Sequence, residues 1–225
     1  IEEASPQHLV YQLDYDFYIG RYPVTNQEYS LYLREANQPI IMAKNKVRNP
    51  IVDISWNQVQ GFIVWLNEKY REDLPSDHGF CLPSEPEWEK SARGVDGNKY
   101  PWGNEFDARK CNSLEGRRKE TTPVGIYSPQ GDSAYGAADM AGNVWELTRS
   151  LGWMRKGVSL LVRIFGYPYR FDDGREDESI DIIGNHVLRG GSFKGGKNSV
   201  RCAYRTWPTL STLEDNWGFR LAICP

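Results

Sequence analysis

The sequence predicts a fold of short helices and short strands that is rich in loops. Two observations predict it. Three capping boxes of the form Ser/Thr-x-x-Glu/Gln occur in the first half of the chain, where each indicates the start of a helix. After Gly94, Gly, Pro, Asn and Asp recur every few residues and no long helical period is present. Aromatic residues make up 13% of the chain and can fix loops to a core, so we expect order there.

The predicted helices follow their capping boxes directly. The three boxes are Thr25 with Glu28, Ser55 with Gln58, and Ser84 with Glu87. Apolar residues follow the first two boxes at helical spacing, the second set being Val59, Phe62, Ile63 and Leu66. The third helix is expected from Glu85 to about Arg93, with Pro86 tolerated in its first turn. Segments 17–22 and 51–54 precede the first two helices and indicate strands or extended chain.

Bulk properties exclude some classes of protein and leave one domain, 1–225, as the simplest organisation. The net charge of −3 gives no reason to expect a nucleic acid as partner. No run of 18 apolar residues is present, so no membrane span is expected. No signal peptide is recognisable. Because the chain begins with Ile1, we expect a fragment or processed form of a longer protein, fused to another domain before residue 1.

Four cysteines, at positions 81, 111, 202 and 224, form no Cys-x-x-Cys pair. This pattern favours reduced, buried cysteines over disulfides and therefore a cytoplasmic location. The segment from Leu151 to Ile183 is basic at first and then acidic, and we interpret it as an insertion that forms a solvated surface loop.

A series of motifs in fixed order resembles the formylglycine-generating-enzyme, or sulfatase-modifying-factor, family. They are GRYPVTNQEY at 20–29, NPIVDISW at 49–56, CLPSEPEWE at 81–89, YPWG at 100–103, TPVG at 122–125, MAGNVWE at 140–146, VLRGGSF at 187–193, VRCAYR at 200–205 and WGFRLA at 217–222. The resemblance implies an α+β domain with the family's variant of the C-type lectin fold. Such a domain has little regular secondary structure, with two or more helices against a twisted antiparallel sheet.

The resemblance implies either an enzyme or a binding protein. The family contains a copper-dependent cysteine oxidase, which needs two cysteines between the Gly-Gly-Ser turn and the next Arg-Cys, and also members without catalysis. Residues 192–201 contain no cysteine, so no copper and no catalytic residues are expected. We therefore expect a non-catalytic module that binds a protein or small-molecule ligand. The alternatives are an oxidase with a displaced cysteine pair and a partner-docking domain of a larger signalling or effector protein.

The expected binding face consists of the loops 194–199 and 206–217. In non-catalytic relatives this stretch is the ligand-binding surface, which in some of them is varied by a diversity-generating retroelement. Aromatic residues in loops are usual binding anchors. The candidate ligand-binding residues are Lys194, Lys197, Asn198, Tyr204, Thr206, Trp207, Thr209, Leu210, Thr212, Glu214 and Trp217. The acidic stretch 172–181 could border this face.

The resemblance also implies structural calcium at two places. Calcium binds six to eight oxygens of carboxylates, amides and carbonyls, which loops can supply. One site would use Asn112 and Glu120, and the other Asn143 and Glu146. The alternative is that Asn143 serves a turn after Gly142 and that Glu146 pairs locally.

Four arginines lie in the tail motifs, Arg189, Arg201, Arg205 and Arg220. Arginine can clamp a carboxylate bidentately, but the fixed motifs favour buried pairing with glutamates or carbonyls that supports the loops. We expect the core to include Trp145, Arg189, Gly190, Gly191, Phe219 and Arg220.

Overall fold

The computed structural model describes residues 13, 15–40, 45–156, 162–170, 172–176, 182–207 and 214–225. Within these residues the helices are α1 Asn26–Glu35, α2 Trp56–Lys69 and α3 Glu85–Arg93, with 3-10 turns η1 Arg71–Asp73 and η2 Leu114–Gly116. The strands are β1 Tyr18–Ile19, β2 Gly79–Cys81, β3 Trp145–Lys156, β4 Arg163–Ile164, β5 Ile182–Arg189, β6 Arg205–Thr206, β7 Trp217–Phe219 and β8 Ala222–Cys224. None of the helices in these ranges is long and apolar enough to cross a bilayer.

All three helices begin as the capping boxes predict. In each helix the Ser or Thr side chain accepts a hydrogen bond from the backbone N–H three residues later, and the Glu or Gln side chain accepts one from the capping residue's N–H. The predicted apolar face of α2 is buried in the main core, where Phe62 is 2% exposed. The segment 51–54 forms no strand, and an isolated bridge joins Pro50 to Thr25 instead.

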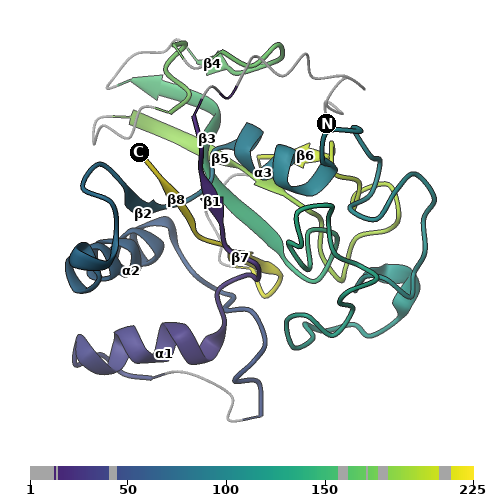
Figure 1. Cartoon of the computed structure of the whole chain (residues 1–225), viewed down its shortest axis with the longest axis horizontal. Helices are drawn as coiled ribbons and strands as arrows, with labels where there is room; N and C mark the ends of the chain where they lie inside the picture. The colour runs from purple at the N-terminus through teal and green to yellow at the C-terminus, as the bar shows by residue number, and fades with distance from the viewer. Residues whose placement is uncertain are drawn as a thin grey trace.

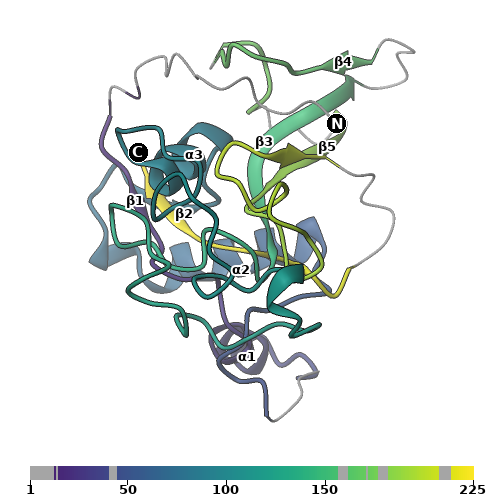
Figure 2. The same ribbon diagram turned by 90° about the vertical axis from the view of Figure 1, so that its right-hand side faces the viewer.

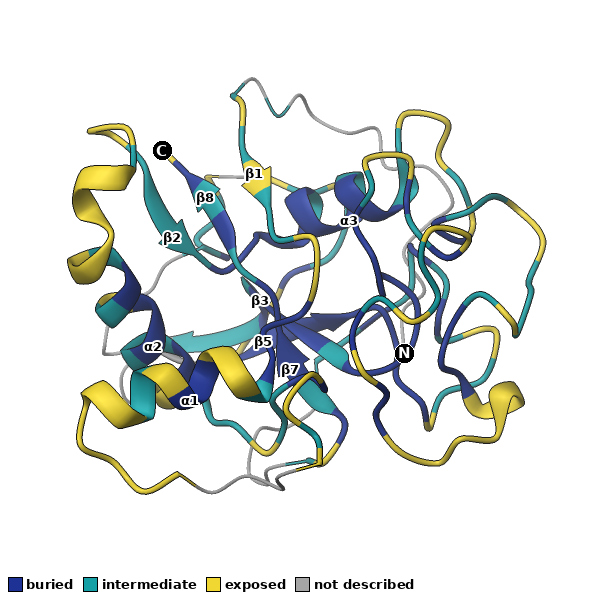
Figure 3. Cartoon of the chain, turned by 60° about the horizontal axis from the view of Figure 1, so that its bottom comes forward, coloured by how far each residue is buried: buried dark blue, intermediate teal, exposed yellow. Residues whose placement is uncertain are grey.

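Two sheets organise the strands. The first has three antiparallel strands in the order β1-β8-β2. The second has the order β4-β3-β5-β6, and β7 pairs with β3 in parallel. Figure 1 shows α1 and α2 together on one side of these strands, with α3 on the other. Buried residues concentrate at β3, β5 and β7, while the helices α1 and α2 expose their outer turns (Figure 3).

Long loops form most of the region between α3 and β3, and they are ordered around aromatic side chains. Tyr100 is 2% exposed and packs with Trp102, Phe106 and Val200 in a separate small core. Gly142 has a φ of +79°, and a Cβ there would overlap the carbonyl oxygen of Asn112. This confirms the expectation that the loop-rich half of the chain is structured. Figure 2 shows these loops, in teal, on the side of the molecule away from β4.

The described part of the segment from Leu151 to Ile183 is only partly the solvated loop that we expected, since residues 162–164, 168, 170 and 172 are exposed but other residues are buried. Residues 177–181 of its acidic stretch lie outside the described residues. Leu151 is 2% exposed because β3 continues through it and pairs with β5. Phe165 is 2% exposed, and Arg175 is 1% exposed and paired with Asp173 at 2.7 Å. Charge pattern alone could not reveal that an arginine in this segment is buried beside its carboxylate.

The expectation that all the cysteines are reduced was also wrong, because Cys81 and Cys224 form a disulfide. Antiparallel pairing of β2 with β8 places Cys81 opposite Ala222 and Gly79 opposite Cys224, which brings the two cysteines together. Their sequence separation of 143 residues hides this proximity. Cys111 and Cys202 are buried and not disulfide-bonded, as expected. The disulfide removes the argument from cysteines for a cytoplasmic location.

Candidate functional site

Helix α3 places a row of buried glutamates against arginines of the second sheet. The Glu85 carboxylate accepts hydrogen bonds from Arg205 at 2.7 Å and from Arg189 at 3.1 Å, and all three side chains are fully buried. Glu89 accepts a further bond from Arg189 at 2.6 Å. Buried ion pairs of this kind are costly to break, because the remaining charge has no water. The predicted structural role of Arg189 and Arg205 is confirmed.

Glu146 and Arg220 form a second buried pair beside the first. Both carboxylate oxygens accept from the Arg220 guanidinium, at 2.5 and 2.7 Å, and Trp88 Nε1 donates to one of them at 2.6 Å. Arg220 also donates to the carbonyl of Ala138, so it ties the loop before β3 to the tail. Arg201 differs, since it is half-buried and its Nε donates to the carbonyl of Asn198.

The residues expected to hold calcium fit that ion poorly. Both carboxylate oxygens of Glu146 accept hydrogen bonds from Arg220. The guanidinium charge already neutralises this carboxylate and would repel a cation beside it. Asn143 Oδ1 already accepts from Thr122 N at 2.9 Å and from Asn112 Nδ2 at 3.1 Å. Among the residues that the structure describes, no three His, Cys, Asp or Glu side chains gather as a metal site.

Asn112 retains one feature of a cation site. Its Nδ2 donates to the backbone carbonyl of Glu120 at 2.9 Å, while its Oδ1 is buried without a hydrogen-bond partner. The Glu120 carboxylate lies elsewhere, exposed and paired with Lys46 at 3.0 Å. Calcium therefore stays a prediction, and Asn112 Oδ1 is the candidate ligand atom that has no hydrogen-bond partner.

The two loops of the expected binding face meet through their polar side chains. Lys194 forms an ion pair with Asp215, and both side chains are about half exposed. Beneath them, Asn216 Nδ2 donates to Ser192 Oγ at 2.8 Å, and both residues are buried. The segment after the Gly-Gly-Ser turn and the segment before β7 therefore form one continuous surface.

Half-buried aromatic rings lie at the sheet strands next to this surface. Trp145 and Trp217 are direct partners in the parallel pairing of β3 with β7. The Trp145 ring lies 5.8 Å from that of Tyr204, measured between centroids. We call Trp145, Lys194, Tyr204, Asp215 and Trp217 the binding face. Trp145 is half-buried and packs against the main core, and the other residues expected in the core, Arg189, Gly190, Gly191, Phe219 and Arg220, are buried.

Trp207 lies against a different set of neighbours. The Arg205 guanidinium lies between two rings, 4.7 Å from the centroid of Trp207 and 4.8 Å from that of Tyr167. A Cβ at Gly152 would overlap the Trp207 ring, so this glycine makes room for it. Thr206 is half-buried in β6, where it is the partner of Leu188.

The remaining candidates contribute mainly through their backbone. The Lys197 N–H donates to Glu115 at 2.8 Å, and its carbonyl accepts from the Tyr100 hydroxyl at 3.1 Å. The Glu214 carbonyl accepts from Trp217 N at 3.1 Å. Asn198 is exposed. Thr209, Leu210 and Thr212 lie outside the described residues.

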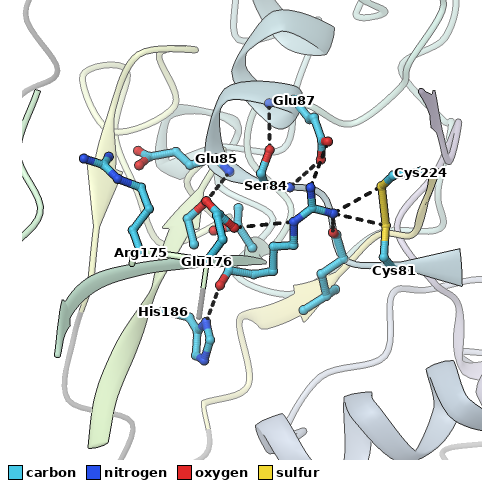
Figure 4. Close-up of polar contacts among 12 residues, drawn as sticks. Cys81, Ser84, Glu85, Glu87, Arg175, Glu176, His186 and Cys224 are labelled. Atoms are coloured by element: carbon cyan, nitrogen blue, oxygen red, sulfur yellow. Dashed lines mark hydrogen bonds and ion pairs between the residues drawn. A yellow bond between two sulfur atoms is a disulfide. The ribbon is translucent and has the colours of Figure 1, made fainter. Parts of the chain in front are cut away.

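Sequence reasoning missed a polar cluster around Arg149 of β3, shown in Figure 4. Arg149 Nη1 lies 3.2 Å from Cys224 Sγ and 3.4 Å from Cys81 Sγ, so one guanidinium nitrogen contacts both sulfurs of the disulfide. Its Nη2 donates to Glu87 at 3.0 Å, and its Nε lies 3.4 Å from Glu176. No local motif marks this cluster, because its members come from four separate parts of the chain.

These features define a domain in which buried arginine–glutamate pairs support long loops beside a small mixed sheet. The chain belongs to the family described as the sulfatase-modifying factor enzyme 1-like domain, whose profile matches residues 2–224. It is 34% identical over 195 residues to the inactive C-alpha-formylglycine-generating enzyme 2 of Bos taurus, covering 80% of this chain and 52% of that protein. It is 27% identical to the serine/threonine-protein kinase pkn1 of Chlamydia pneumoniae, covering 98% of this chain and 34% of the kinase.

Among solved structures, Treponema denticola variable protein 1 superposes with a TM-score of 0.70 at 20% identity, covering 93% of this chain and 84% of that one. PvdO from Pseudomonas aeruginosa superposes with a TM-score of 0.64 at 22% identity, covering 92% and 80%. These likenesses confirm the predicted α+β fold. The chain spans about a third of the length of the Chlamydia kinase and about half that of the bovine protein.

Proposed function

We propose that this domain is a non-catalytic binding module, and that its ligand contacts the binding face. The observations that carry the proposal are the exposed Lys194–Asp215 pair, which joins the two loops, and three half-buried aromatic side chains. These are Trp217, which follows Asp215 by two residues, its strand partner Trp145, and Tyr204 beside Trp145. Aromatic rings that are partly exposed beside adaptable polar groups provide contact area at a low cost in side-chain entropy. The backbone beneath is held by buried hydrogen bonds, so binding needs little reorganisation.

The state of the cysteines supports a role without catalysis. An oxidase of this family would need a pair of accessible thiols, since copper(I) prefers soft thiolate ligands. Cys111 and Cys202 are 2% and 0% exposed, and burial raises the pKa of the Cys111 thiol to about 12. The other two cysteines form a disulfide. The name of the bovine relative, an inactive enzyme, points the same way.

Selection of random peptides displayed on phage would test the face directly. Peptides enriched on the wild-type domain should lose at least tenfold in affinity on Lys194→Ala and Tyr204→Ala. Binding should persist on the control Tyr18→Ala, since that residue is 65% exposed on β1 in the other sheet. Peptides that bind the face variants as tightly as the control would contradict the proposal.

A separate assay tests the absence of oxidase activity. The domain is reduced, loaded with copper(I) and incubated with a cysteine-containing sulfatase-type peptide. We expect the peptide mass to stay unchanged. A mass loss that matches conversion of the thiol to an aldehyde would favour an oxidase with a displaced cysteine pair.

A second candidate function is docking within a larger signalling protein. The observation in its favour is that the chain matches about a third of the length of the Chlamydia kinases. A gene that joins this domain to a kinase or effector domain would support docking. A template repeat with matching flanks beside the coding region would instead indicate a surface diversified by a retroelement.

A further inference from the structure

We propose that Cys81 and Cys224 form a reversible thiol–disulfide site, in which Arg149 stabilises the thiolate that reduction produces. The site is independent of the binding face. Its geometry carries the inference, because one guanidinium nitrogen lies 3.2 and 3.4 Å from the two sulfurs. A cation beside sulfur favours the thiolate over the thiol. It therefore favours the reduced pair over the disulfide, and it makes the departing sulfur a better leaving group.

The position of the two sulfurs assigns different roles to them. Cys81 lies in β2 and is half-buried, whereas Cys224 is 6% exposed. An external thiolate therefore reaches Cys81 Sγ more readily. Cys224 Sγ is the sulfur closer to Arg149, so the charge that leaves on Cys224 forms beside the guanidinium.

The reaction is an exchange with an external thiol such as glutathione or a small dithiol. The thiolate attacks Cys81 Sγ and forms a mixed disulfide, while the electron pair of the broken S–S bond leaves on Cys224 Sγ. A second external thiolate then attacks the external sulfur of the mixed disulfide and releases Cys81 as a thiolate. In the overall exchange, two external thiols are oxidised to one external disulfide, and the protein disulfide is reduced to two cysteine thiols. The two protons pass from the external thiols to the cysteines.

Other charged groups share the guanidinium and set the size of its effect. Glu87 of α3 accepts from Arg149 Nη2, and Glu176 lies near its Nε. The Tyr15 hydroxyl donates to Glu87 at 2.5 Å, and the Tyr169 hydroxyl donates to Glu176 at 2.7 Å. Burial raises the pKa of Glu176, and protonation of that carboxyl leaves more of the positive charge for sulfur. The third guanidinium nitrogen, Nη1, faces the two sulfurs and donates to the Leu82 carbonyl at 3.2 Å, so its charge is not shared directly with a carboxylate.

Equilibration of the wild-type domain in glutathione buffers, followed by alkylation and mass spectrometry, tests the site. We expect the disulfide to pass from oxidised to reduced within the range of the buffers. Arg149→Met should make it about tenfold harder to reduce, which corresponds to about 30 mV for this two-electron couple. Arg109→Met is the matched control, since Arg109 pairs with Asp107 on the surface. A wild-type disulfide that resists reduced glutathione alone would overturn the proposal, as would equal equilibria in the Arg149 and Arg109 variants.

A thiol-reactivity measurement keeps the proposal testable even where Arg149→Met does not fold. In Cys224→Ser the remaining Cys81 thiol lies near Arg149, so its alkylation rate should reach half its maximum below the pH of about 8.5 typical of free cysteine. Cys111 and Cys202 serve as internal controls, because burial raises the pKa of both thiols. A midpoint for Cys81 at or above pH 8.5 would show that Arg149 does not stabilise the thiolate.

Discussion

The pairing of Glu146 with Arg220 shows how a single residue can anchor distant segments of this fold. Both side chains are fully buried, and their hydrogen bonds join β3 to the tail. Glu146→Gln leaves the Arg220 charge without its partner, so we expect a loss of about 3–5 kcal/mol in the free energy of unfolding. Urea denaturation at pH 7 measures it. Glu120→Gln is the control, because its exposed ion pair should contribute less than about 1 kcal/mol.

His186 should make the fold sensitive to acid. Burial lowers the pKa of His186 to about 4, and its ring stacks on Trp56 at 3.5 Å between centroids. The unfolded chain binds this proton near pH 6.5, so the contribution to stability is complete above that pH and is lost as the pH falls towards 4. When the pH falls from 7 to 5, the free energy of unfolding should decrease in both proteins. The decrease should be about 1–2 kcal/mol smaller for His186→Gln than for the wild type. Equal losses would show that this histidine does not titrate as its burial implies.

Asp139 should act in the opposite direction. Burial raises its pKa to about 6, although the Gly125 N–H donates to its carboxylate at 2.7 Å. The folded state therefore holds this proton more tightly than the unfolded state does, and ionisation above pH 6 costs stability. Asp139→Asn removes that cost, and asparagine tolerates the φ of 56° here. We expect the stability of the variant relative to that of the wild type to be higher at pH 7 than at pH 4. Urea denaturation of both proteins at the two pH values measures it, and an equal difference at both would contradict the raised pKa of Asp139.

Calcium can be tested at Asn112, the residue with an unsatisfied buried oxygen. A bound ion stabilises the folded state by mass action, so the melting temperature should be higher in calcium chloride than in EDTA. Asn112→Asp keeps the oxygen and should keep the difference, whereas Asn112→Ala should abolish it. Identical melting temperatures of the wild-type domain in both solutions would contradict the prediction that it binds calcium.

At the scale of elements, local sequence predicted the helices well because each helix is encoded by its own cap. The three capping boxes differ in environment, since Ser84 is 1% exposed whereas the hydrogen bonds of the Ser55 box are exposed. Ser55→Ala should cost about 1 kcal/mol, typical of a cap in contact with water. Ser84→Ala should cost more, because it leaves the buried Glu87 N–H without its partner. Thermal melting of the two variants measures the difference, and equal costs would contradict it.

The strands were harder to predict because their partners are distant in the chain. Leu151 and Arg175 lie in a segment whose charges suggest a surface loop, yet Leu151 is buried in β3 and Arg175 is buried beside Asp173 and the Tyr169 ring. The Cys81–Cys224 disulfide has the same origin, since only the pairing of β2 with β8 brings the cysteines together. Contacts of this kind depend on topology, and neither propensity nor local charge records them.

At the scale of the whole molecule, the ordered series of motifs was enough to predict the fold, while the binding face stays a prediction. Lys194 lies where the two loops meet and Trp217 begins β7, whereas Trp207 lies against Arg205. Trp145 packs against the main core, which fits its assignment to the core. Alternation along β3 could have indicated that Trp145 and Leu147 share one side of the strand, while Glu146 faces the other. How far each ring is buried depends on tertiary contacts, and local sequence patterns do not predict these.

The division between scaffold and surface gives a final prediction for the molecule. Phe219 is fully buried in the main core, and Phe219→Ala should cost about 3–5 kcal/mol, a large part of the stability of a typical domain. The combined variant Lys194→Ala, Tyr204→Ala and Asp215→Ala removes side chains that are exposed or half-buried, so it should melt cooperatively within a few degrees of the wild type. Circular dichroism during heating compares the two. A triple variant that fails to fold would show that these side chains are needed for packing, and it would contradict their assignment to an exposed binding surface.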